Sequence, residues 1–157
     1  GTGTESENDR QPEELPFRFE SGNLNVPGIV GLGQGVQFLL QRGVESVCRH
    51  EQQLTGRLLE GLAELPGITC HGPASALHRT GVVSLNLDGH DPHELAALLD
   101  QLASVQVRAG FHCAPLMHRA LKTAQQGGTV RVSCGPFNTA EDIQTVLDTL
   151  RQLDDRR

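Results

Sequence analysis

Two short segments with alternating side chains constrain most strongly what this chain folds into. In VVSLNL, residues 82–87, valine and leucine alternate with serine and asparagine, and in TVRVSC, residues 129–134, valine and cysteine alternate with threonine, arginine and serine. Because successive side chains of a strand point to opposite faces, both segments predict half-buried strands with one apolar and one polar face. With the helical patterns around them, they predict a small α+β domain.

Helical periodicity and helix-start signals predict the helices of that domain. Leucine and valine recur at helical spacing in residues 44–65. The segment Asp91–Glu94 combines an N-cap aspartate with proline at the first helical position, and Thr139–Asp142 resembles a capping box. The glycine-rich segment 28–42 contains no phosphate-loop motif, so we predict a helix whose glycines allow close packing on another element.

The predicted architecture is α+β, with a sheet of about four strands backed by helices and a long helical region at 28–65. The strands are expected at residues 68–70, 82–87, 105–108 and 129–134. Residues 1–27 are polar and acidic at their start and rich in turn formers, which predicts a loop or tail segment. We expect residues 28–157 to form the small α+β domain.

Composition excludes several functional classes. The net charge of −6 and the lack of a basic run argue against nucleic-acid binding, and the absence of Trp and Tyr removes most base-stacking platforms. No apolar run approaches the roughly 18 residues of a membrane span. The four cysteines form no CxxC pair and match no zinc or disulfide framework, which predicts free thiols, a cytoplasmic setting and no metal site.

Free cysteines and scattered histidines have ordinary structural explanations as well. Cys48 and Cys134 fall on apolar positions of their segments, so both are predicted to be small buried residues. Most of the seven histidines, His118 among them, are predicted to lie on the surface.

The turn after residue 108 combines residue types that suit nucleophilic chemistry. It places Cys113 beside His112 and within reach of Arg108. Thiolate is the nucleophilic form of cysteine, and neighbouring cations stabilise it. Arg131 lies on the polar face of its strand, where its guanidinium would bind a carboxylate in bidentate fashion if that face lines a cleft. From residue types alone, an inert turn cysteine and a solvated strand arginine remain open alternatives.

Several segments, in order, resemble the C-terminal part of a cysteine desulfurase of the class V aminotransferase family, whose members are fold-type I enzymes that use pyridoxal phosphate (PLP). The resemblance rests on GTGT at 1–4, RFESGNLN at 18–25, the glycine-rich helix at 26–35, RAGFHCAP at 108–115, and RVS followed by FNT at 131–139. It implies that residues 28–157 are the small C-terminal domain of such an enzyme.

The resemblance also implies roles for the residues around the turn. Cys113 would take the sulfur of L-cysteine as a persulfide and leave alanine. Arg131 would bind the substrate carboxylate, and Arg108 and His112 would shape the substrate site. A sulfur acceptor protein and a homodimer are the partners that the family implies.

PLP binding is implied for the complete enzyme, not for this chain alone. Thr2 and Asn23 resemble residues that contact the PLP phosphate, although relatives usually carry Thr where this chain has Asn23. The chain has one lysine, Lys122, whose surroundings do not match the family's Schiff-base motif. We therefore expect this chain to be the C-terminal portion of a longer enzyme and to be inactive alone.

Alternative functions remain open on the sequence. Within the family, the chain is also compatible with a selenocysteine lyase or a related class V lyase or aminotransferase. Outside catalysis, it is compatible with a dimerisation or binding domain that retains the fold. A stand-alone thiol or metal protein built on Cys113 and His112 is a third reading.

Overall fold

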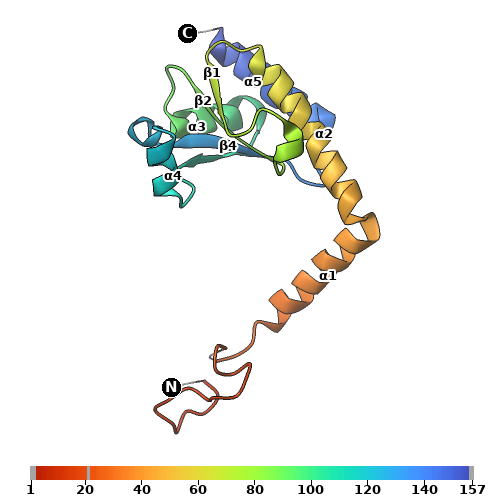
Figure 1. Cartoon of the computed structure of the whole chain (residues 1–157), viewed down its shortest axis with the longest axis vertical. Helices are drawn as coiled ribbons and strands as arrows, with labels where there is room; N and C mark the ends of the chain where they lie inside the picture. The colour runs from red at the N-terminus through yellow and green to blue at the C-terminus, as the bar shows by residue number, and fades with distance from the viewer. Residues whose placement is uncertain (1–2, 21, 156–157) are drawn as a thin grey trace. The chain divides into compact units, whose positions relative to one another are not determined.

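The computed structural model describes residues 3–20 and 22–155, and the chain divides into two compact units, Gly1–Gly43 and Val44–Arg157 (Figure 1). The first unit contains helix α1 (Val26–Arg42), which confirms the helix predicted for the glycine-rich segment. The side chain of Asn25 caps α1 by accepting a hydrogen bond from the Gly28 N–H at 3.1 Å. The domain boundary expected after residue 27 concerns a larger enzyme and stays a prediction.

The second unit is an α+β domain with a four-stranded antiparallel sheet in the order β1-β2-β4-β3. This confirms the predicted fold class and number of strands. Its helices are α2 (Val44–Ala63), α3 (Pro92–Ala103), α4 (Pro115–Ala120) and α5 (Ala140–Asp154). Its strands are β1 (Ile68–His71), β2 (Val82–Leu87), β3 (Arg108–Gly110) and β4 (Thr129–Ser133).

The core lies between one face of the sheet and helices α2, α3 and α5 (Figure 1). Leu85 of β2 and Val130 of β4 are fully buried against Leu58, Leu99 and Leu150, one from each helix. Each such side chain stabilises the fold by about 1.5–3 kcal/mol through burial. The alternation of the strands therefore leaves a second, polar face of the sheet outside this core.

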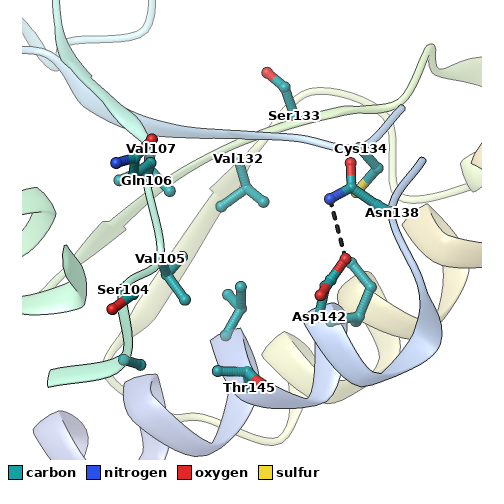
Figure 2. Close-up of a pocket in the computed structure, with 13 residues that line it drawn as sticks. Ser104, Val105, Gln106, Val107, Val132, Ser133, Cys134, Asn138, Asp142 and Thr145 are labelled. Atoms are coloured by element: carbon teal, nitrogen blue, oxygen red, sulfur yellow. Dashed lines mark hydrogen bonds between the residues drawn. The ribbon is translucent and has the colours of Figure 1, made fainter. Parts of the chain in front are cut away.

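The third strand is shorter than predicted and lies further along the chain. We predicted residues 105–108, but pairing with β4 begins only where Arg108 faces Arg131 and ends where Gly110 faces Thr129. The segment before it lines one side of a pocket of about 410 Å³, whose other sides are the end of β4 and the start of α5 (Figure 2). The strand prediction was wrong here because backbone pairing depends on a partner strand, which local alternation does not reveal.

The two cysteines predicted to be buried have different outcomes. Cys134 is buried, and burial raises the pKa of its thiol to about 11, with the carboxylates of Glu51 and Asp142 adding to the shift. Cys48 is exposed, so that prediction was wrong. Its neighbour Val47 faces the core instead, and one helical residue rotates the side-chain direction by roughly 100°.

Helix α5 begins with the predicted capping box. The Thr139 hydroxyl accepts from the Asp142 N–H at 3.3 Å, and the Asp142 carboxylate accepts from the Thr139 N–H at 2.9 Å. We expect Thr139→Ala to lower the free energy of unfolding by about 1 kcal/mol, the usual effect of losing an N-cap side chain. Urea denaturation followed by circular dichroism measures it. Thr145→Ala, which removes an exposed hydroxyl inside the same helix, is the control and should be nearly neutral.

Candidate functional site

A row of polar side chains crosses the sheet on the face opposite the core. The strand register aligns His71 with Ser84, Ser84 with Arg131, and Arg131 with Arg108. Residues paired in this way project from the same face, with side chains close enough to interact. Like charges directly opposite one another destabilise a sheet, so the pair of arginines at β3 and β4 is best suited to binding an anion.

Arg131 holds a donor without a partner in this row. Its side chain is half-buried, and its Nε atom is buried with no hydrogen-bond partner among the described residues. Leaving a buried N–H unpaired costs roughly 1–3 kcal/mol, more for a charged group. A carboxylate that accepts from the guanidinium would remove this cost, because its two oxygens match the planar fork of arginine.

Cys113 lies in the loop between β3 and α4, next to the charge of Arg108. The Arg108 Nη2 donates to the Cys113 sulfur at 3.4 Å, and the Cys113 side chain is exposed. A hydrogen bond from Ala114 N–H to the Phe111 carbonyl, 2.8 Å long, closes the turn. The loop therefore presents an accessible sulfur with a cation beside it, the surroundings typical of reactive cysteines.

His112 connects this loop to the sheet. Its Nε2 lies 3.1 Å from both the carbonyl oxygen and the hydroxyl oxygen of Thr129. Burial, followed by the positive charge of Arg131, lowers the pKa of His112, so the ring is neutral at neutral pH. Arg108 bonds Cys113 and is paired with Arg131, whose charge acts on His112. The four residues predicted for the substrate site therefore lie together, on β3, on β4 and in the loop. Their roles remain predictions.

The structure does not place the two residues predicted to contact PLP relative to this arrangement. Thr2 lies outside the described residues. Asn23 belongs to the first unit, just before α1, and its side chain is exposed. Both assignments therefore stay predictions.

His118 was wrongly predicted to lie on the surface. It is 3% exposed, and its Nδ1 lies 2.8 Å from the Thr123 hydroxyl oxygen. Its ring contacts the Phe111 ring edge-on, with centroids 5.3 Å apart, and lies 5.7 Å from the ring of His112. Helix α4 has only six residues, so no periodic pattern marks its buried side and no sequence signal would have identified this residue.

Within residues 3–20 and 22–155, no cluster of three or more His, Cys, Asp and Glu side chains has metal-binding geometry. None of the helices in these ranges is both long and apolar enough to cross a bilayer.

Comparisons with known proteins agree with the fold. The sequence profile described as Aminotransferase class-V matches residues 2–146. A probable cysteine desulfurase of Methanothermobacter thermautotrophicus is 35% identical over 141 residues, which cover 90% of this chain and 35% of that protein. A cysteine desulfurase of Salmonella agona is 36% identical over 143 residues, covering 89% of this chain and 33% of that protein.

A solved structure of a cysteine desulfurase also matches this chain. The apo structure of a cysteine desulfurase from Thermococcus onnurineus superposes with a TM-score of 0.83 at 37% identity, over 90% of this chain and 34% of that one. The chain thus spans about a third of the length of these relatives. Since the family profile covers most of the chain, this protein belongs to the class-V aminotransferase family.

Proposed function

We propose that this chain supplies the sulfur-accepting cysteine and the carboxylate-binding arginine of a cysteine desulfurase. The observation that carries the proposal is the hydrogen bond from Arg108 to the Cys113 sulfur. Arg131, whose Nε has no partner among the described residues, is paired with Arg108 across the sheet. The identity with cysteine desulfurases of other organisms supports the same assignment. The anion site would hold the carboxylate of a thiol-bearing amino acid, and the accessible sulfur of Cys113 would attack its sulfur.

The proposed reaction balances without an external oxidant or reductant. The Cys113 thiolate attacks the sulfur of L-cysteine, so that an S–S bond forms and the substrate C–S bond breaks. The electron pair of that C–S bond remains with carbon, which takes up a proton; PLP bound in the complete enzyme would supply the electron sink that stabilises this charge. The products are a Cys113 persulfide and L-alanine. A sulfur acceptor protein would then remove the outer sulfur.

The described residues offer no lysine in surroundings that match a Schiff-base site, although the family is generally PLP-dependent. A PLP enzyme needs a lysine that forms a Schiff base in a closed site. The one lysine of this chain, Lys122, is exposed in the turn after α4, where it adopts a left-handed backbone with φ of 61°. We therefore assign the Schiff-base lysine to another part of the enzyme, while Thr2 and Asn23 stay candidates for contacting the PLP phosphate.

The chain alone is expected neither to bind PLP covalently nor to release sulfide from cysteine. The reason is the unsuitable position of Lys122. The test incubates the full chain with PLP and L-cysteine, reduces it with borohydride and determines the mass of each peptide. A reduced adduct on Lys122 together with alanine release, both lost in Lys122→Arg, would contradict this expectation.

A chimera tests the proposed function directly. In it, this chain replaces the matching third of the Thermococcus onnurineus cysteine desulfurase, the relative of known structure. We expect the chimera to release alanine from L-cysteine and to carry one extra sulfur on Cys113, detected by mass spectrometry. A folded chimera with bound PLP that forms no alanine would overturn the proposal.

Localisation and assembly follow from the same proposal. A sulfur-accepting thiol has to stay reduced, and all four cysteines of the chain are free, which suits a cytoplasmic protein. A homodimer is the assembly that the family resemblance favours.

A further inference from the structure

The loop that carries Cys113 contains two consecutive residues in a left-handed backbone conformation. The φ angles of His112 and Cys113 are 51° and 61°. Cys113 is not among the types that adopt this conformation more readily, which are glycine, asparagine, aspartate and histidine. Such a conformation persists only where surrounding contacts fix it.

The local contact within the loop does not fix its position on the sheet. The hydrogen bond from Ala114 N–H to the Phe111 carbonyl closes the turn but involves no other element. The imidazole of His112, in contrast, reaches β4, where Thr129 places its carbonyl and its hydroxyl 3.1 Å from Nε2. Thr129 is 1% exposed and is paired with Gly110 in the sheet, so it is a rigid anchor.

The partners of His112 determine its tautomer. A carbonyl oxygen only accepts hydrogen bonds, so the proton of the neutral ring lies on Nε2, which donates to Thr129. The other nitrogen, Nδ1, is buried and has no partner among the described residues. Nε2 is thus occupied by Thr129, which is the polar contact that the described residues offer to this ring.

Contacts with the ring of His118 also support this loop. The buried ring of His118 lies against both Phe111 and His112, and the Thr123 hydroxyl fixes its Nδ1. The loop is therefore packed on His118 on one side and hydrogen-bonded to Thr129 on the other. In this arrangement the sulfur of Cys113 lies 3.4 Å from the Arg108 Nη2.

We propose that His112 is a positioning residue, which binds Thr129 so that the strained loop holds Cys113 beside Arg108. This inference rests on the proposed function, in which Cys113 accepts the sulfur. It replaces the role of substrate binding predicted for His112 from the family resemblance.

Two amide substitutions of His112 test whether its Nε2 atom, which binds Thr129, positions the loop. His112→Gln places an N–H near the position of Nε2 and retains the bond to Thr129, whereas the shorter side chain of His112→Asn does not reach Thr129. In the full chain, site-resolved mass spectrometry measures the alkylation rate of Cys113 by iodoacetamide. We expect His112→Asn to slow it by about fivefold, the factor that one net hydrogen bond represents, and His112→Gln to remain close to the parent.

The exposed Cys48 of α2 is alkylated in the same sample and serves as an internal reference. His71→Gln is the matched control, because His71 also binds through Nε2, to the Asn86 side chain on β2, but not to the loop. A second pair tests the anchor itself: Thr129→Val should slow the alkylation of Cys113, and Thr129→Ser should restore it. Thr149→Val, which removes a buried hydroxyl from α5, should not change it.

The chimera separates positioning from substrate binding. We expect His112→Asn to lower kcat and to leave KM for L-cysteine unchanged. Equal alkylation rates in His112→Asn and the parent, or equal loss in His112→Gln and His112→Asn, would overturn the inference. A raised KM in both variants would return His112 to substrate binding. If the alkylation pattern holds but the chimera forms no alanine, the proposed function fails and the positioning role stands.

Discussion

Replacing Cys113 by alanine in the chimera is expected to abolish persulfide formation and alanine release while the PLP content stays at the parent level. Cys113 is the cysteine whose sulfur lies beside Arg108, whereas Cys134 is buried with a raised pKa. A buried, protonated thiol is a poor nucleophile, so Cys134 does not replace it. Alanine release and the mass of the Cys113 peptide measure the loss, and the absorbance of bound PLP measures the cofactor.

The matched control is Cys48→Ala, which removes an exposed cysteine from α2. It should retain the full rate of alanine release and the extra sulfur on Cys113. Persulfide that persists in Cys113→Ala would assign the sulfur to another cysteine. Loss of PLP from that variant would mean that Cys113 is structural.

Local patterns predicted those parts of the fold that local chemistry determines. Alternation in 82–87 and 129–134 placed Leu85 and Val130 on the buried face, as observed. The caps at Asp91 and Thr139 marked the starts of α3 and α5, because each satisfies backbone N–H groups of the first turn with its own side chain. Both signals lie within a few residues of the structure that they specify.

The structural predictions were wrong where a segment distant in the sequence determines the local structure. Strand β3 is limited to Arg108–Gly110 by its register with β4, about twenty residues further along the chain. His118 is buried because Thr123 and the loop around Cys113 close over a helix too short to show a periodic pattern. The residues next to β3 and next to His118 in the sequence therefore carry no signal for the bounds of the strand or for the burial of the histidine.

In the candidate site, too, the sequence predicted the residues but not the contacts between them. The residue types of Cys113, Arg108 and Arg131 were sufficient to select them from the sequence. Their contact depends on the left-handed loop and on the register that places Arg108 opposite Arg131, and both are tertiary features. The unpartnered Nε of Arg131, which favours an anion over a solvated charge, is visible only in the structure.

Arg131→Lys in the chimera is expected to weaken the use of L-cysteine strongly. Lysine keeps the positive charge but has no Nε–H and no planar fork, so it does not pair with both oxygens of a carboxylate. Losing a charge-assisted hydrogen bond of this kind costs about 1.5–3 kcal/mol, which corresponds to a roughly ten- to 150-fold lower kcat/KM. Steady-state kinetics of alanine release over a range of L-cysteine concentrations measures it.

Arg49→Lys is the control for the exchange of one cation for another. Arg49 lies on α2 and forms an exposed ion pair with Glu45 at 3.7 Å, so its replacement should leave kcat/KM unchanged. If Arg131 were a solvated strand charge, Arg131→Lys would behave in the same way. A parent-like kcat/KM would therefore remove Arg131 from the substrate site, and the carboxylate half of the proposed function with it. A large loss confined to Arg131→Lys would instead show that the guanidinium fork, and not charge alone, holds the substrate.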